Sequence, residues 1–302
     1  GLASRNRLTV VKFYDFDETW QTWAGDFLAA CAWILDNREL HRVTTVLTAV
    51  NWSVDSGISA AMQELLDVGI LPVAAMGNSG PATEYPSYPA YSPGVLTVGA
   101  VNSDGAVSAF SSRGYLNGSQ PDLVAPGGGL LSSRGRIMAA DNEPNDSYSG
   151  RFGTSLAAAH AAGSLALVDE ALRKAGFDLG SERSAARVRK AVLLAATAEV
   201  HQAEDAGGNS VSALPISDGP DEIRGWGLLR ADAAVEALLT PLTPGRSQTV
   251  ALENAPDLAP SPLEELLGRD ALARYELALA TLEEDERELV VGRLEFHCSF
   301  QE

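Results

Sequence analysis

The sequence predicts an α/β protein in which a mostly parallel sheet has helices on both faces, followed by an all-α helical hairpin at the C-terminus. Three observations support this fold class. Over residues 1–240, short apolar runs alternate with amphipathic segments, which is the βα pattern of a parallel sheet. Prolines then recur over 241–256, which predicts a linker. The remaining residues, 257–302, contain two amphipathic helical patterns within 261–296.

The elements of the first region follow from its apolar and turn-forming segments. Strands are expected in the apolar runs at 8–16, 43–54, 70–78 and 94–101. Helices are expected over 25–37, from an N-cap at Ser56 to about Val68, from near Thr154 onward, over 182–198 and over 230–239. Loops are expected over 79–93 and 205–221, with a turn at Pro126 and Gly127.

The formal net charge of −18 excludes two classes of partner. Non-specific binding to nucleic acid or to anionic lipid needs a basic surface, so we expect neither nucleic acid nor a membrane as a partner. No run of 18 apolar residues is present, and residues 1–15 lack the order of a signal peptide. Gly1 is not an initiator methionine, which leaves open an internal fragment of a longer protein. Cys31 and Cys298 lie far apart in dissimilar regions, so we predict no disulfide framework.

A serine in a small-residue turn is the first candidate for chemistry. In "RFGTSLAAAHAAGSLALV" (151–168), Ser155 follows a glycine and precedes an apolar run, so it opens a helix with its hydroxyl exposed. The positive end of the helix dipole favours negative charge that develops there. The alternative is an ordinary N-cap serine.

His160, five residues after Ser155, is not expected to act as its base. Five residues along a helix correspond to about 7.5 Å of rise and about 140° of rotation, so the two side chains point apart. We expect His160 to pack in or near the core, and a base for Ser155 must come from elsewhere.

A second candidate follows the buried strand in "PVAAMGNSG" (72–80). Asn78 lies directly after that strand, at the carboxyl edge of the sheet, where ligands of α/β proteins bind. Its side-chain amide can donate to an oxyanion. Alone, the segment favours an ordinary turn residue.

Together these segments resemble the subtilisin-like serine proteases, over roughly residues 1–240. "GTSLAAAHAAG" resembles the nucleophile motif of that family, and "VAAMGNSG" resembles its oxyanion-hole segment. The family order is also matched by "DNRELHRVTTVLTAVNWSV", "YPAYSPGVLTVGAVNSDGAVSAFSSRG", "PDLVAPGGGLLSS" and "GWGLLRADAAVEAL". The resemblance implies a subtilisin-like fold, peptide-bond hydrolysis through an acyl-enzyme, a protein or peptide substrate and a secreted or extracellular parent protein.

The resemblance also implies roles for individual residues. Ser155 would be the nucleophile and Asn78 the oxyanion donor. The segment Ser53, Val54 and Asp55 would pair with the substrate backbone, and Gly77 would line the pocket for the residue before the cut. No cofactor and no metal ligand is evident from the residues, although calcium is common in the family.

The sequence departs from the family pattern in its catalytic partners. The family takes an aspartate and a histidine from segments ahead of the serine, and neither motif occurs here. "GLASRNRLTVVKF" resembles the segment just after the histidine helix, so both partners would lie upstream of Gly1 and the chain as given would be inactive. Asp15 or Asp17 with His41 is the weaker alternative. Ala159 replaces the usual proline after the nucleophile, which should not remove the chemistry.

The tail resembles a different family. "ALATLEEDERELVVGRLEFHCSFQE" is similar to the start of region four of bacterial sigma factors of the extracytoplasmic-function type, which implies a cytoplasmic protein. The sequence ends before the recognition helix of that region. With four Arg, no Lys and twelve Asp and Glu over 257–302, this piece is not expected to bind DNA. A solvated helical hairpin is the alternative. The second hypothesis for the whole chain is therefore a non-catalytic protease-like domain joined to a transcription or protein-interaction module.

Overall fold

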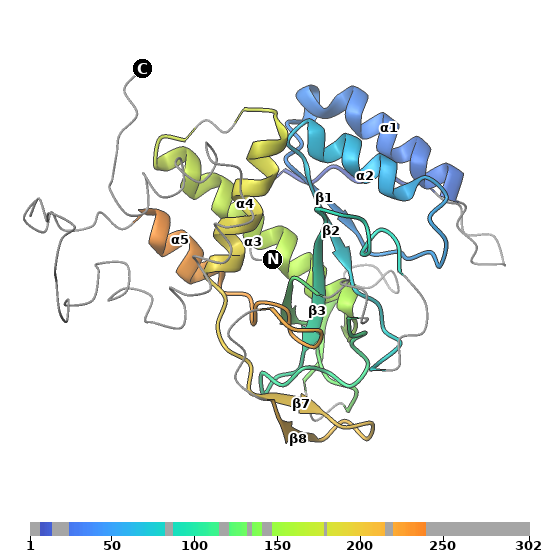
Figure 1. Ribbon diagram of the computed structural model, residues 1–302, viewed down its shortest axis with the longest axis vertical. Helices are drawn as coiled ribbons and strands as arrows, with labels where there is room; N and C mark the ends of the chain where they lie inside the picture. The colour runs from blue at the N-terminus through green and yellow to red at the C-terminus, as the bar shows by residue number, and fades with distance from the viewer. Residues whose placement is uncertain are drawn as a thin grey trace, which may run out of the picture.

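The computed structural model describes residues 7–13, 24–81, 87–114, 121–131, 135–140, 147–177, 180–214 and 220–239 (Figure 1). Its helices are α1 (Ala24–His41), α2 (Ile58–Asp67), α3 (Thr154–Lys174), α4 (Arg183–Ala195) and α5 (Ala231–Leu239). Its strands are β1 (Thr45–Thr48), β2 (Leu71–Ala75), β3 (Leu96–Val101), β4 (Leu123–Pro126), β5 (Ile137–Ala140), β6 (Tyr148–Arg151), β7 (Gln202–Glu204) and β8 (Ser210–Ala213). The predicted linker and tail lie outside the described residues.

The centre of the fold is a four-stranded parallel sheet in the order β1-β2-β3-β4. The helix α3 packs against all four strands, while α1 and α2 lie side by side over the other face (Figure 1). The alternation of side chains in β2 shows the two faces: Val73 and Ala75 belong to the core with α3, and Ala74 belongs to the core with α1 and α2. The predicted α/β class with helices on both faces is therefore confirmed.

Small side chains let α3 lie close to the sheet. Ala157, Ala158 and Ala161 are fully buried beneath it, facing the apolar side chains of β2, β3 and β4. Each Val or Leu buried there contributes about 1.5–3 kcal/mol relative to an exposed position. This packing fixes the start of α3, and with it Ser155, at the carboxyl ends of the strands.

Several predicted boundaries are wrong. The run at 43–54 forms only the four-residue strand β1, and the described part of the expected strand 8–16 is not a strand. The hairpin β5–β6 was not expected, and β8 falls within the expected loop 205–221. These short strands are largely exposed or irregular, so they lack the continuous apolar run that marks a buried parallel strand.

The N-cap of α2 is also not the predicted Ser56. Gly57 takes that position with a left-handed φ of 89°, and the carboxylate of Asp55 accepts the backbone N–H of Ser59 at 2.9 Å. Because Asp55 supplies the acceptor, the exposed first turn of α2 needs no hydroxyl cap.

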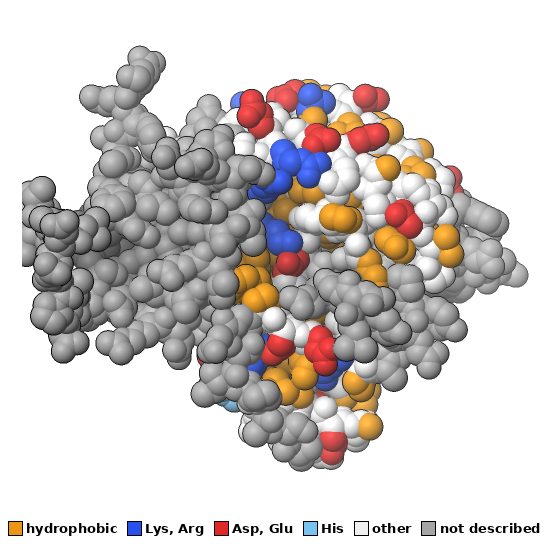
Figure 2. Space-filling model, in the orientation of Figure 1, with side chains coloured by type: hydrophobic (Ala, Val, Ile, Leu, Met, Phe, Trp, Pro, Cys, Tyr) orange, Lys and Arg blue, Asp and Glu red, His pale blue; other side chains and the backbone are white. Residues whose placement is uncertain are grey.

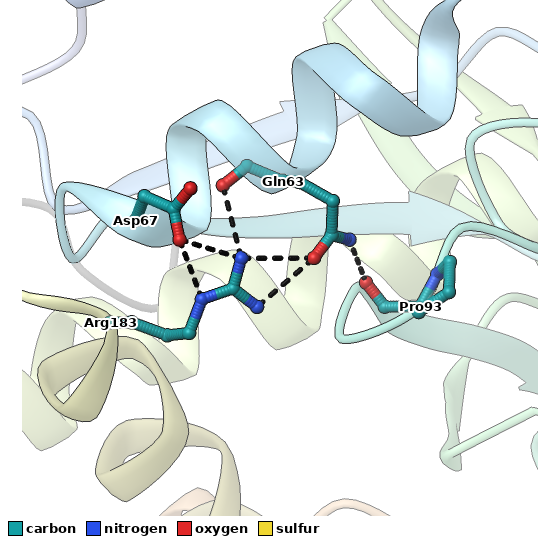
Figure 3. Close-up of polar contacts among 4 residues, drawn as sticks. All are labelled: Gln63, Asp67, Pro93 and Arg183. Carbon is teal, nitrogen blue, oxygen red and sulfur yellow. Dashed lines mark hydrogen bonds and ion pairs between the residues drawn. The ribbon is translucent and has the colours of Figure 1, made fainter.

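Polar side-chain contacts connect α4 to α2. At the start of α4, Arg183 donates to the carboxylate of Asp67 at 2.7 Å and to the side-chain oxygen of Gln63 at 3.0 Å (Figure 3). Gln63 in turn donates to the carbonyl of Pro93 at 2.6 Å. A continuous series of side-chain hydrogen bonds therefore connects α4, α2 and the turn before β3.

The surface is mixed in character. On the face drawn in Figure 2, acidic, basic and apolar side chains are interspersed. Among the described residues, no helix is long and apolar enough to cross a bilayer. The thiol of Cys31 is free and buried beneath α1, and its burial raises its pKa to about 12.

Candidate active site

A polar pocket of about 380 Å³ opens at the carboxyl ends of β1 and β2, beside the first turn of α3. The lining residues come from five segments of the chain. They are Ala49, Asn51, Trp52 and Ser53, then Met76, Gly77, Asn78 and Ser79, then Ser87 and Ser112, and finally Thr154 and Ser155. Ligands of open α/β sheets bind at this edge, as the sequence predicted.

The residue that precedes the first turn of α3 is a glycine, because the backbone there adopts a positive φ that other residues rarely take. Gly153 has a φ of 149°, and a Cβ there would lie 3.5 Å from the amide nitrogen of Asn78. The next residue, Thr154, is completely buried, and its hydroxyl accepts the backbone N–H of Gly77 at 3.2 Å. The start of α3 is therefore locked to the end of β2.

The same threonine orients the side chain of Asn78. Both the backbone N–H and the hydroxyl of Thr154 donate to Asn78 Oδ1, at 2.9 and 3.0 Å. Since an N–H must face an oxygen, these two bonds fix which end of the amide is which. The nitrogen Nδ2 makes no hydrogen bond within the described residues, so it is available as a donor in the pocket.

Ser155 lies half-buried in the same pocket, in the first turn of α3. Its hydroxyl has one contact in the described residues, a weak one with the carbonyl of Ala49 at 3.5 Å. The backbone N–H groups of a first helical turn have no partner within the helix, and the helix dipole is positive there. A hydroxyl, an amide donor and a positive helix end thus meet at one point.

The structure separates the predicted substrate-binding residues into two groups. Ser53 and Gly77 line the pocket with Ser155 and Asn78, whereas Val54 and Asp55 do not. The Asp55 carboxylate caps α2, and the backbone N–H of Ser59 is the main cause that lowers its pKa. The carbonyl of Val54 already accepts the N–H of Ser56 at 3.1 Å.

No histidine lines this pocket in the part of the chain that the structure describes. His160 lies on α3, where it is half-buried and its ring nitrogen Nδ1 lies 2.9 Å from the carbonyl oxygen of Leu156, away from the pocket lining. His41 ends α1 and stacks on Trp33 at 5.5 Å. Its suggested partners, Asp15 and Asp17, lie outside the described residues.

Several residues that line the pocket were not predicted from the sequence. Thr154 could have been found as the neighbour of Ser155, because a buried threonine at a helix start needs a partner. Asn51 and Ser112 lie in segments that match the family order, but no pattern singled them out; they lie next to Gly77, where a Cβ would be 3.0 Å from Ser112 Oγ and 3.6 Å from Asn51 Nδ2.

The described residues offer no evident site for a metal ion. No cluster of three or more His, Cys, Asp or Glu side chains is placed to bind an ion within the described ranges. The pocket itself offers only neutral oxygen and nitrogen atoms from its described lining.

Comparison with known proteins identifies the family. The sequence model of the Subtilase family (Peptidase_S8) matches residues 35–227, which include Ser155, Asn78 and most of the described pocket-forming chain. The chain belongs to the subtilase family. It is 30% identical over 175 residues to subtilisin of Bacillus pumilus, covering 56% of this chain and 55% of that protein. It is 34% identical over 186 residues to the subtilisin-like protease PopC of Myxococcus xanthus, covering 55% of this chain and 38% of that protein.

The chain therefore spans about half the length, or less, of these curated relatives. Among solved structures, the fold is similar to that of the prenylagaramide maturation protease PagA. That match has a TM-score of 0.54 and 24% identity, and it covers 74% of this chain and 70% of the other. At this identity the likeness supports the subtilase fold and nothing finer.

Proposed function

We propose that this chain carries the nucleophile side of a serine endopeptidase site, with Ser155 as nucleophile and Asn78 in the oxyanion hole. The observation that carries the proposal is the orientation of Asn78. Thr154 holds Oδ1 with two hydrogen bonds and thereby leaves Nδ2 to donate beside Ser155. Membership of the subtilase family supports the same reaction class.

The proposed reaction is acyl transfer to Ser155. Its Oγ attacks the carbonyl carbon of the scissile peptide bond while a histidine takes the hydroxyl proton, and the oxygen becomes an oxyanion. Asn78 Nδ2 and the backbone N–H of Ser155 stabilise that charge. The histidine then protonates the leaving amine, and water releases the acyl group. Ser53 and Gly77 would border the bound protein or peptide.

The base is the part of the mechanism that the described residues do not supply, because no histidine lines the pocket there. We place the histidine and its aspartate upstream of Gly1, following the family resemblance. On this proposal, hydrolysis by Ser155 requires that histidine and aspartate, and we expect the residues of this chain alone to be inactive. The expectations of a secreted parent and of calcium binding rest on the same resemblance and stay predictions.

A second candidate follows from the weak contact of Ser155. Its hydroxyl touches only the carbonyl of Ala49, at 3.5 Å, among the described residues. This geometry fits a domain that binds peptides without cutting them, joined to the tail 257–302, for which the sequence predicts helices.

A fluorophosphonate probe separates the two candidates. In the full natural polypeptide that contains this chain, we expect covalent labelling of Ser155, located by mass spectrometry of the digested protein. A Ser155→Ala variant should lose the label, while Ser103→Ala, an exposed serine outside the pocket, should keep it. An intact, folded protein without label at Ser155 would overturn the endopeptidase proposal and favour peptide binding alone.

A further inference from the structure

The described walls of the pocket beside Ser155 are neutral and polar. Their chemistry therefore indicates which kind of substrate side chain the pocket would bind. No charged side chain is among the described lining residues. Trp52 and Met76 provide apolar surface, and Asn51, Ser79, Ser87 and Ser112 provide hydrogen-bonding groups. The question is which of these groups remain available to a ligand.

Asn51 offers an acceptor. Its amide nitrogen Nδ2 donates to the carbonyl of Ala75 at 3.3 Å and, in a short contact, to the hydroxyl of Ser87. An amide nitrogen has two hydrogens, so both are used. The oxygen Oδ1 makes no hydrogen bond within the described residues, and it is therefore left to accept one.

Ser112 offers a donor. The residue is 1% exposed, its hydroxyl oxygen accepts the backbone N–H of Ser79 at 3.0 Å, and its own N–H donates to the carbonyl of Gly77 at 3.0 Å. The hydroxyl hydrogen has no acceptor among the described residues. A buried hydroxyl whose hydrogen has no acceptor can donate it to a ligand in the pocket.

Asn51 and Ser112 both adjoin the same glycine. Gly77 has a φ of 114°, and a Cβ there would lie 3.0 Å from Ser112 Oγ and 3.6 Å from Asn51 Nδ2. Both polar side chains therefore lie against Gly77 in the wall of the pocket.

We propose that this pocket selects a carboxamide side chain, Gln or Asn, in the residue before the cleaved bond, with Asn51 and Ser112 as the specificity-determining residues. The inference rests on the proposed function for its place in the substrate. A carboxamide has one acceptor oxygen and an N–H donor, which match the Ser112 hydroxyl and the Asn51 oxygen. The carboxylate of Glu would place an acceptor against Asn51 Oδ1. The ammonium of Lys would find no counter-ion in the described lining, and Leu would leave both groups unpaired.

The test measures binding and needs no catalysis. Peptides that end in Gln, Asn, Glu, Leu or Lys, otherwise identical and carrying a fluorophore at the N-terminus, are titrated into the Ser155→Ala form of the full natural polypeptide. Fluorescence anisotropy should show the Gln or the Asn peptide binding about 10-fold or more tighter than the Leu, Glu and Lys peptides, because a buried polar group left unpaired is costly.

Two variants connect the preference to its residues. Ser112→Ala should reduce the ratio of carboxamide to Leu affinity about 10-fold, and Asn51→Leu, at an exposed position, should do the same without depending on a buried hydroxyl. The exposed Ser103→Ala variant should leave the ratio unchanged.

Each outcome decides the matter. Tightest binding of the Leu, Glu or Lys peptide, equal binding of all five, or no binding of any overturns the carboxamide preference. An unchanged preference in both pocket variants overturns the assignment to Asn51 and Ser112. Failure of the proposed function is detected by a different measurement. The wild-type protein would then carry no fluorophosphonate label on Ser155, independently of the peptide affinities.

Discussion

Two polar clusters lie at opposite ends of the parallel sheet, and they differ in how completely their groups are paired. At the amino ends, the carboxylate of Asp169 in α3 accepts hydrogen bonds from Arg189 at 2.5 Å and from the hydroxyl of Thr44 at 2.6 Å. Arg189 also donates to the carbonyl of Gly69 at 2.7 Å. At the carboxyl ends, Asn78 has a paired oxygen and a nitrogen that is unpaired within the described residues.

The difference teaches how to separate structural from functional polar groups in this fold. The side chains of Asp169 and Arg189 are each 8% exposed, and a charge at that depth is tolerated only when it is paired and hydrogen-bonded. The groups around Ser155 are held by some bonds and left available by others, in a pocket open to solvent. Saturation marks the cluster that serves the fold, and an oriented but unpaired group marks the one that serves a ligand.

The largest expected effect breaks the saturated cluster. Asp169→Ala leaves the charge of Arg189 buried without its carboxylate, so the free energy of unfolding should fall by about 3–5 kcal/mol. The matched control is its neighbour Glu170, whose ion pair with Lys174 is 2.7 Å long but more than half exposed. Glu170→Ala should cost no more than about 0.5 kcal/mol. Urea denaturation measures both values, and equal losses would contradict the comparison.

The next effect concerns catalysis and not stability. Asn78→Asp keeps an acceptor for the two donors of Thr154 but removes the Nδ2 donor. If Asn78 holds the oxyanion, kcat for peptide hydrolysis by the full natural polypeptide should fall about 100- to 1000-fold.

The melting temperature serves as the control for Asn78→Asp. It should stay close to that of the wild type, because the contacts that position α3 are retained. A variant with normal kcat would remove Asn78 from the oxyanion hole, and a large fall in melting temperature would assign it a structural role.

These two clusters also show what the sequence could and could not predict. The apolar runs located β2, β3 and α3, and the position of Asn78 after a buried strand placed it beside Ser155 at one edge. The pairing of Asp169 with Arg189 had no signal, because it joins two helices through a salt bridge 20 residues apart in the chain. Such contacts depend on how the helices pack, which local patterns do not encode.

The same limit applies within the site. Ser155 and Gly77 were named from the motifs that contain them. Ser112 was not, and it reaches the pocket because the chain after β3 returns, so that its N–H donates to the carbonyl of Gly77. Asp55 shows the same limit for a side chain. The family resemblance assigns its segment to pairing with the substrate backbone, which stays a prediction, and no local pattern indicated that its carboxylate caps α2.

A smaller effect is expected where the pairing is partly exposed. Arg183 links Asp67 and Gln63 at the surface of α2, with its side chain 34% exposed and that of Asp67 60% exposed (Figure 3). Arg183→Ala should lower the free energy of unfolding by about 1 kcal/mol, less than Asp169→Ala, because solvent can replace the lost bonds. Arg230→Ala, which breaks a more exposed pair with Asp232, is the control and should cost less still. A loss of about 3 kcal/mol or more for Arg183→Ala would equal the loss expected for the buried pair. It would show that solvent exposure does not determine which of these ion pairs contributes more stability.

An effect comparable to that of Arg183→Ala tests whether Asp55 belongs to the fold or to the site. Asp55→Ala removes the acceptor for the N–H of Ser59, and loss of such a cap costs about 1 kcal/mol of unfolding free energy. Because that N–H lowers the pKa of Asp55 below its ordinary 3.8, the carboxylate stabilises the fold above that pH and loses its contribution as the pH falls further.

The wild type should therefore lose its advantage over Asp55→Ala at acidic pH, and chemical denaturation at pH 7 and at successively lower pH measures this change. Peptide affinity in the Ser155→Ala background should be the same with Asp55 or Ala at this position, since Asp55 does not line the pocket. A stability difference that persists at low pH would contradict the capping role. Weaker peptide binding would return Asp55 to the substrate-binding surface, and a saturated side chain would then no longer suffice to assign a residue to the fold.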